Sequence, residues 1–193
     1  MALPMKLIVG LDLDGVLFDW DAGWRKAYDL WFDTKLSDLR SIEWDLLPET
    51  HFKDYDQFYR WAQQANVFGN LYPLPGALGG VYTWLEQQIA VRIVTSRPDW
   101  AAGATAASLA RFGLTPGRLG SNGIELVFDP EKWNAKADLY VDDSPEVLKG
   151  LKARGKTTVR FAQPWNKHVR ATVVANNWSE LTSLVLDMAG VVA

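Results

Sequence analysis

Apolar positions along the chain follow two different spacings. Short runs rich in Val, Ile and Leu alternate with longer segments in which apolar residues recur every three or four positions. The short runs predict strands at 6–13, 90–95, 124–128, 137–143 and 157–161. The longer segments predict helices at 77–88, 101–113, 144–155 and 176–188. Gly113 stands at a helix end, and Ser144 followed by Pro145 marks a helix start.

This alternation predicts the fold class. Strands that alternate with helices form a parallel sheet with helices on both faces, in an α/β, Rossmann-like arrangement. Functional sites of such sheets lie outside the carboxyl ends of the strands. The residues at which each strand stops are therefore the candidates for chemistry.

The segment after the first predicted strand differs from the rest of the chain in composition and pattern. It is acidic and aromatic, it contains no clear strand, and Trp20, Trp24, Tyr28 and Trp31 recur at helical spacing. Twelve of the 24 aromatic residues fall between positions 19 and 70, and the sequence YPLPG then ends the segment. We expect a small helical cap at 18–72, inserted into a core formed by 1–17 and 73–193. Most of its aromatics would fill its own core, and some would line a pocket for a flat ligand.

Composition narrows the class of protein. The chain is 48% apolar with a formal net charge of −3, which is ordinary for a globular protein and argues against a nucleic-acid polymer as partner. Without cysteine it has neither disulfides nor a thiolate site. No apolar run approaches the ~20 residues of a membrane helix, and the first residues are too short and weakly basic for a signal peptide. We therefore expect a cytoplasmic protein without a membrane partner.

Polar residues gather where the predicted strands stop. The first strand ends in two acids followed by a glycine, a later strand ends in two hydroxyl residues and an arginine, and another ends in an acidic pair preceded by a lysine. In order, these residues are Asp12, Asp14, Gly15, Thr95, Ser96, Arg97, Lys132, Asp142 and Asp143. All should converge on one edge of the sheet.

This set of groups suits phosphate chemistry. Clustered carboxylates repel one another unless a cation is present, and all-oxygen ligands favour Mg²⁺. A lysine and two hydroxyls would hold a phosphate, with backbone N–H groups of Gly15 adding to them. One carboxylate can attack phosphorus, and a second can protonate the leaving oxygen and later activate water.

The same residues resemble the motifs of the haloacid dehalogenase (HAD) superfamily. LDLDGVLFD resembles its first motif, VTSRP its second, Lys132 its third and LYVDDSP its fourth. The resemblance implies that Asp12 is the nucleophile and Asp14 the general acid/base. The implied metal ligands are Asp12, Asp14 (through its backbone carbonyl), Asp142 and Asp143. The implied phosphate-binding residues are Thr95, Ser96 and Lys132.

Within the superfamily the chain resembles the 5'(3')-deoxyribonucleotidase family. KWNAKADLYVDD and YPLPGA are similar to elements of that family, whose helical cap follows the first motif. The resemblance implies Mg²⁺-dependent removal of phosphate from (deoxy)ribonucleoside monophosphates through an aspartyl-phosphate. Two positions depart from the family pattern. The family commonly has TSP at its second motif, whereas here Arg97 stands between Ser96 and Pro98. The family also has an arginine shortly before the lysine of its third motif, whereas this chain has FDPE before Lys132.

Several residues are candidates for substrate contacts. Phe18, four residues after Asp14, and Trp44 are proposed to stack on a base; the further candidates are Trp20, Trp61 and Phe68. Arg97 would bind phosphate or a substrate hydroxyl, or would pair with an acid of the cap. The loop QPWNKH at 163–168 follows a strand and could border the site, without an evident chemical role.

Other functions fit the same residues. The alternative substrate is another small phosphorylated metabolite, such as a sugar phosphate. A receiver domain phosphorylated on Asp also gathers acids and a lysine around Mg²⁺, but its order of motifs differs and it has no cap. A non-catalytic binding module is the remaining alternative, against which the complete set of motifs argues. A small cap leaves the site open, so a homodimer that closes it is a further hypothesis.

Overall fold

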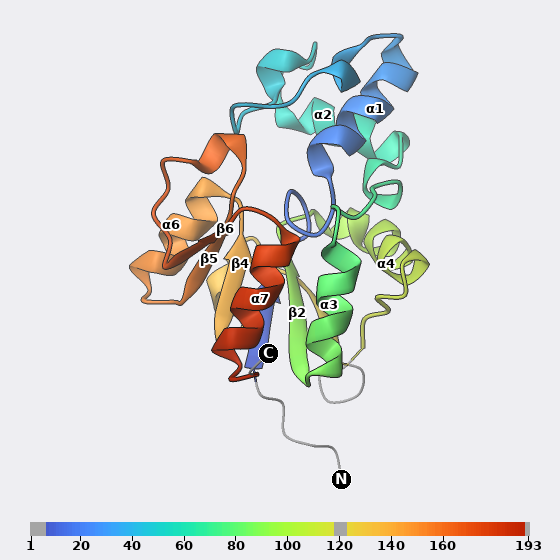
Figure 1. Cartoon of the computed structure of the whole chain (residues 1–193). Helices are drawn as coiled ribbons and strands as arrows, with labels where there is room; N and C mark the ends of the chain where they lie inside the picture. Colours follow the sequence, from blue (N-terminus) through green and yellow to red (C-terminus); the bar gives the residue numbers. More distant parts are fainter. Residues whose placement is uncertain (1–6, 118–122, 192–193) are drawn as a thin grey trace.

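The computed structural model describes residues 7–117 and 123–191, and its centre is a parallel β-sheet (Figure 1). Every strand pair in it is parallel, in the order β3-β2-β1-β4-β5-β6. The strands are β1 (Leu7–Leu11), β2 (Ile89–Thr95), β3 (Ile124–Phe128), β4 (Leu139–Asp142), β5 (Thr158–Phe161) and β6 (Val173–Ala175). The predicted α/β fold class is thereby confirmed. Lys6, where the first strand was predicted to begin, lies outside the described residues.

The register of the central strands decides which residues meet at the carboxyl edge. Leu11 of β1 lies opposite Ile93 in β2 and Val141 in β4. The residues that follow these three positions therefore emerge side by side, although they are far apart in sequence. Strands β1, β2 and β4 are apolar and largely buried, as parallel strands covered on both faces are.

Helices flank the sheet, and their ends follow local capping chemistry. The core helices are α3 (Ala77–Glu86), α4 (Ala102–Arg111), α6 (Pro145–Ala153) and α7 (Trp178–Met188). The side chain of Ser144 accepts the N–H of Val147 at the start of α6, as its sequence predicts. Helices α3 and α7 lie side by side (Figure 1), and the rings of Trp84 and Trp178 join them at a centroid distance of 5.3 Å.

The predicted cap, residues 18–72, lies beyond the carboxyl ends of the strands (Figure 1). We call it the cap segment. It contains α1 (Trp20–Phe32) and α2 (Tyr55–Gln64), which begin at the N-caps Asp19 and Asp54. Most of its aromatic rings pack on one another: Trp24, Tyr28 and Phe58 are almost fully buried, and the ring of Trp24 contacts the rings of the other two. The exact division of the chain into core and cap stays a prediction.

Two further findings complete the fold. Strand β6 was not predicted, because it has three residues, two of them exposed, and so carries no readable apolar pattern. Within the described part of the chain, no helix has the length and apolar character needed to cross a membrane.

Candidate active site

The residues after β1 form a tight loop that begins with the buried Asp12. Its backbone N–H donates to the carbonyl of Val141 (3.0 Å), which extends the pairing of β1 with β4. The chain then folds back: the N–H of Phe18 donates to the carbonyl of Leu13 (2.8 Å), and the N–H of Gly15 donates to the carbonyl of Phe18 (2.9 Å). The expectation that Gly15 offers its N–H to a phosphate is therefore wrong for this conformation, because the loop already uses that donor.

Gly15 is nevertheless required by the geometry of the site. Its φ is +81°, in the left-handed region that favours glycine. A Cβ atom at this position would lie 2.1 Å from Oδ2 of Asp143. Glycine therefore allows the acid at the end of β4 to approach the loop that carries Asp12.

Lys132 lies between two of the predicted acids. It opens the short helix η5 (Lys132–Asn134), and its Nζ is 2.7 Å from Oδ1 of Asp12 and 2.8 Å from Oδ2 of Asp142. Burial alone would lower the pKa of Lys132, but the charges of the two aspartates raise it above the ordinary lysine value. Lys132 therefore stays protonated and compensates part of the buried negative charge.

Three buried acids form a cluster that fits a divalent cation. Asp12, Asp142 and Asp143 each offer an oxygen, and these oxygens lie within 4.8 Å of one another. Both oxygens of Asp142 are engaged, since Oδ1 accepts the N–H of Ser144 (2.9 Å) and Oδ2 binds Lys132. In contrast, Oδ1 of Asp143 is buried and, within the described part of the chain, has no hydrogen-bond partner. A buried carboxylate oxygen without a donor is a natural ligand for a cation.

The pKa values of the cluster point the same way. Burial raises the pKa of Asp12 to about 7, with Asp142 and Asp14 adding to the rise and Lys132 opposing it. Burial and the neighbouring charges of Asp12 and Asp142 also raise the pKa of Asp143 well above its usual range. The single positive charge of Lys132 thus does not balance the negative charge of these acids, and a divalent cation would supply the missing positive charge.

The two predicted hydroxyl residues differ in their surroundings. Thr95 ends β2 and is buried, and its Oγ1 accepts the backbone N–H of Arg97 (3.2 Å). Ser96 is exposed and lines the cavity described below. The structure therefore places both residues at the same edge as Asp12, with Ser96 the more accessible donor.

Arg97 binds neither of the partners expected from the sequence, which were a substrate group and an acid of the cap. Its Nε and Nη2 donate to the two carboxylate oxygens of Asp14 (2.7 and 2.6 Å), and its Nη1 donates to Oγ1 of Thr105 (2.9 Å). The guanidinium group also stacks over the ring of Phe68, 4.6 Å from its centroid. Arg97 therefore binds an acid of the core rather than a cap acid, and its donors already have partners within the protein.

A cavity of about 480 Å³ joins this edge of the sheet to the cap segment. Its floor contains Asp12, Asp14, Lys132 and Asp143, together with the end of β2. Its walls are aromatic and acidic: Trp20, Asp21, Trp24, Ser41, Glu43, Trp44, Asp45, Leu46, Tyr55, Tyr59, Phe68 and Trp165. Burial raises the pKa of Tyr59, and the charge of Asp14 adds to the rise.

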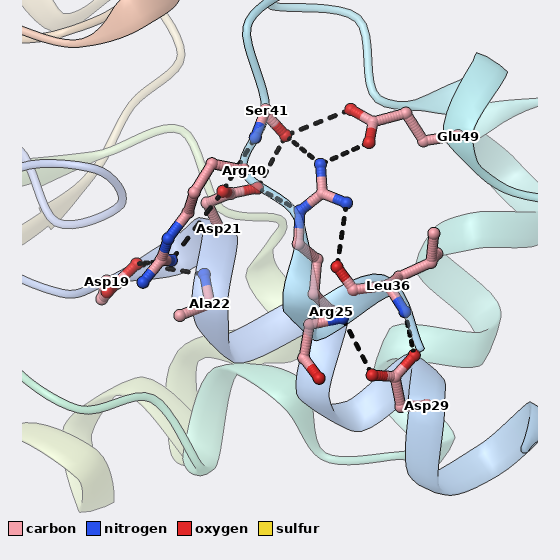
Figure 2. A network of polar contacts seen from close by, with 10 residues as sticks. Asp19, Asp21, Ala22, Arg25, Asp29, Leu36, Arg40, Ser41 and Glu49 are labelled. Atoms are coloured by element: carbon pink, nitrogen blue, oxygen red, sulfur yellow. Dashed lines mark hydrogen bonds and ion pairs between the residues drawn. The ribbon is translucent and has the colours of Figure 1, made fainter. Parts of the chain in front are cut away.

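A buried polar network holds the acidic wall of the cavity in place (Figure 2). The guanidinium group of Arg25 is fully buried and binds Asp21 (2.8 Å), the hydroxyl of Ser41 (2.7 Å) and Glu49. Ser41 in turn donates from its hydroxyl and its backbone N–H to Asp21. These contacts tie α1 to the irregular segment 36–49, so the position of Trp44 depends on a network rather than on a regular element.

Comparison with protein-family models decides the identity of the chain. Residues 6–191 match the family described as 5' nucleotidase, deoxy (pyrimidine), cytosolic type C protein. The chain belongs to this family.

Individual relatives of this nucleotidase family member agree with the assignment. A protein of Chlorobaculum tepidum, described as a proposed 5'(3')-deoxyribonucleotidase, is 29% identical over 188 residues, which cover 93% of this chain and 90% of the relative. The predicted enzyme class, a phosphatase of the 5'-nucleotidase type, is confirmed. The family also implies a small phosphomonoester as substrate.

Solved structures share the fold at lower identity. A HAD family hydrolase from Deinococcus radiodurans, with bound phosphate and sodium, superposes with a TM-score of 0.65 at 15% identity, covering 98% of each chain. A HAD hydrolase from Bacillus subtilis bound to magnesium has a TM-score of 0.63 at 16% identity, covering 93% of this chain and 98% of that one. The HAD fold of this nucleotidase family member is therefore established.

Two of the aromatic candidates for base contacts are wrong. Phe18 has no exposed surface and packs against Phe112 below the cavity, because its place between Asp14 and Pro73 turns it into the core. Trp61 is buried in the aromatic core of the cap segment. The remaining candidates, Trp20, Trp44 and Phe68, do line the cavity.

Four aromatic residues of the cavity were missed, and one of them, Trp24, is almost fully buried. Tyr55 and Tyr59 lie on the first turns of α2, and their i, i+4 spacing on one side of the helix was the available signal. Trp165 lies in the loop 163–168, which the sequence places near the site without naming the residue that reaches it.

Proposed function

We propose that this protein is a Mg²⁺-dependent phosphomonoesterase that removes phosphate from nucleoside monophosphates, with Asp12 as the nucleophile. The observation that carries the proposal is the cavity, which joins a buried acid cluster and Lys132 to a wall of aromatic side chains. A phosphate fits the first part, and a flat group such as a base fits the second. The family of the chain supports the same substrate class.

In the first step, a carboxylate oxygen of Asp12 attacks phosphorus and the bond from phosphorus to the leaving oxygen breaks. The backbone N–H of Leu13 (2.7 Å) and Lys132 both bind Oδ1 of Asp12, which leaves Oδ2 for the attack. Lys132, Thr95 and Ser96 bind the phosphoryl oxygens as charge develops on them. A proton from Asp14 neutralises the leaving oxygen.

In the second step, water attacks the phosphoryl group on Asp12, Asp14 takes the proton of that water, and inorganic phosphate leaves. Each oxygen of Asp14 accepts one hydrogen bond from Arg97, which orients the carboxyl group and leaves the second lone pair of each oxygen for the proton that is transferred. Bound between Asp12, Asp143 and the backbone carbonyl of Asp14, Mg²⁺ would neutralise charge on the phosphoryl oxygens.

A panel of phosphate esters tests the proposal. We expect turnover of dUMP or dTMP at near-neutral pH that requires Mg²⁺ and is lost on addition of EDTA. Asp12→Asn should abolish turnover, and Asp14→Asn should slow both formation and hydrolysis of the phosphoenzyme in rapid-quench measurements by about 10²- to 10⁴-fold. Turnover of sugar phosphates without any turnover of nucleotides would refute the proposed substrate class while leaving the phosphatase chemistry intact.

Two further expectations accompany this proposal. The cytoplasmic location stays a prediction, and so does the homodimer. Sedimentation of the purified full chain at micromolar concentration measures the oligomeric state directly.

A further inference from the structure

The loop 163–168 contains a turn that is fixed to both catalytic loops. The turn is η6 (Pro164–Asn166) with Gln163 as its N-cap, and it follows β5. Nε2 of Gln163 donates to the carbonyl of Gly15 (2.6 Å), in the loop that carries Asp12 and Asp14. Nδ2 of Asn166 donates to the carbonyl of Asp143 (2.8 Å).

The turn is also rigid in itself. Asn166 is fully buried, and its Oδ1 accepts the backbone N–H of Gln163 (3.1 Å) and Nη1 of Arg160 (3.0 Å), while its Nδ2 also binds the carbonyl of Phe161 (2.9 Å). Between Gln163 and Asn166 stands Trp165. Its position relative to the phosphate end of the cavity is therefore set by hydrogen bonds on both sides of it.

Trp165 differs from the other aromatic residues of the cavity. Among the described residues that line it, every other aromatic side chain belongs to the cap segment, whereas Trp165 belongs to the core. Its ring meets that of Trp44 edge to face, at a centroid distance of 6.3 Å and an interplanar angle of 61°. Trp44 is half exposed, and Nε1 of Trp165 has no hydrogen-bond partner within the described residues. The half-exposed ring of Trp44 can therefore tilt away from Trp165 without loss of a hydrogen bond between the two.

The negative charge of the cavity wall near Trp44 and Trp165 limits which substrate groups can bind beside these two rings. Glu43 and Asp45 lie on the same stretch of the cap segment as Trp44, and the only Lys or Arg side chains among the described lining residues are Lys132 and Arg97. Both of these cations are already bound to acids at the floor. A second phosphate would meet negative charge here, whereas an uncharged planar group would not.

We propose that Trp165 is a specificity-determining residue of the proposed nucleotidase, forming the core-side face against which the planar group of the substrate packs, opposite Trp44. The inference rests on the proposed function and adds a basis for the choice among phosphorylated substrates. Because the turn is fixed to the loops of Gly15 and Asp143, the distance from this face to the phosphate end is constant. Substrates with one phosphate and a planar group at that distance are favoured over nucleoside di- and triphosphates.

Paired substrates test this assignment with the full-length enzyme. The pair is dUMP and 2-deoxyribose 5-phosphate, which share the sugar phosphate and differ by the base. Loss of one stacking contact corresponds to about a 5- to 150-fold change, so Trp165→Ala should raise KM for dUMP within that range. The KM for 2-deoxyribose 5-phosphate and the kcat for both substrates should change less than about threefold. Trp165→Phe should restore most of the affinity for dUMP.

The control is Trp31→Ala, which removes an equally large, half-exposed ring from the cap segment outside the cavity and should leave both substrates unaffected. Circular dichroism melts establish that each variant is folded. Equal losses on both substrates in Trp165→Ala would show a merely structural role, and an unchanged KM for dUMP would also overturn the inference. If the wild-type enzyme turns over 2-deoxyribose 5-phosphate but no nucleotide, the proposed function itself is wrong and the inference falls with it.

Discussion

Replacement of Lys132 by methionine offers the sharpest test of how the buried acids are compensated. The Lys132 side chain is 5% exposed and its ammonium group contacts both Asp12 and Asp142. Methionine fills a similar volume without the charge. In the absence of metal, the variant retains three buried carboxylates and no adjacent cation, which is the situation in which a broken buried pair is most costly.

The expected loss follows from this geometry. Removal of one partner from a buried ion pair destabilises a protein by about 3–5 kcal/mol, because the other charge stays buried without compensation. For a chain of this length, that corresponds to a fall in Tm of roughly 6–20 °C. The loss should depend on pH. Because Lys132 lowers the pKa of Asp12, the variant raises that pKa above about 7, so the folded state takes up protons that the unfolded state does not hold. The deficit is therefore larger at pH 8 than at pH 5.5.

Urea unfolding in EDTA at these two pH values measures the effect, and Mg²⁺ should restore part of the lost stability at pH 8 by binding the folded state. Lys136→Met is the matched control, since Lys136 is exposed and four residues away; a change within about 0.5 kcal/mol is expected there. If Lys132→Met in EDTA at pH 8 unfolds within 1 kcal/mol of the wild type, Lys132 does not compensate the acid cluster.

Three further predictions concern the same edge of the sheet. Gly15→Ala forces a Cβ against Asp143 at a positive φ and should weaken Mg²⁺ binding at least tenfold by calorimetry in a folded protein; unchanged binding would mean that Asp143 is not a ligand. Because Asp12, with a pKa of about 7, and Asp143, whose pKa is also raised, must both lose their protons to bind metal, the affinity for Mg²⁺ should rise by about tenfold or more per pH unit between pH 5.5 and 7; a flat titration from pH 5.5 to 8 contradicts this. Arg97→Met frees the carboxylate of Asp14 and should lower kcat by about 10- to 100-fold with KM within threefold, with partial recovery in Arg97→Lys; a kcat within twofold of the wild type would exclude a positioning role.

The order of the elements and the edge that carries the chemistry follow from local information. Strand and helix patterns have different periods, and parallel strands bring their carboxyl ends to one edge whatever their exact register. Asp12, Lys132, Asp142 and Asp143 could therefore be brought together from the sequence alone. The capping of α1 by Asp19 and of α6 by Ser144 is likewise a local effect, because each cap bonds an N–H three residues ahead.

The partners of individual side chains depend on non-local geometry. The pairing of Arg97 with Asp14 joins positions 83 residues apart, and it requires both loops to turn toward each other. The burial of Phe18 and the use of the Gly15 N–H follow from the way the loop after β1 folds back, which no spacing rule describes.

The aromatic residues illustrate the same division. Their abundance in the segment 18–72 predicts a cap with aromatic packing, and that packing is present. Which rings face the substrate was decided by tertiary structure, because a ring in a crowded cluster faces either its neighbours or the cavity depending on helix orientation. Trp61 is buried, whereas Trp44, with the same side chain, is half exposed. Trp165 reaches the cavity only because hydrogen bonds to the loops of Gly15 and Asp143 hold its turn in place.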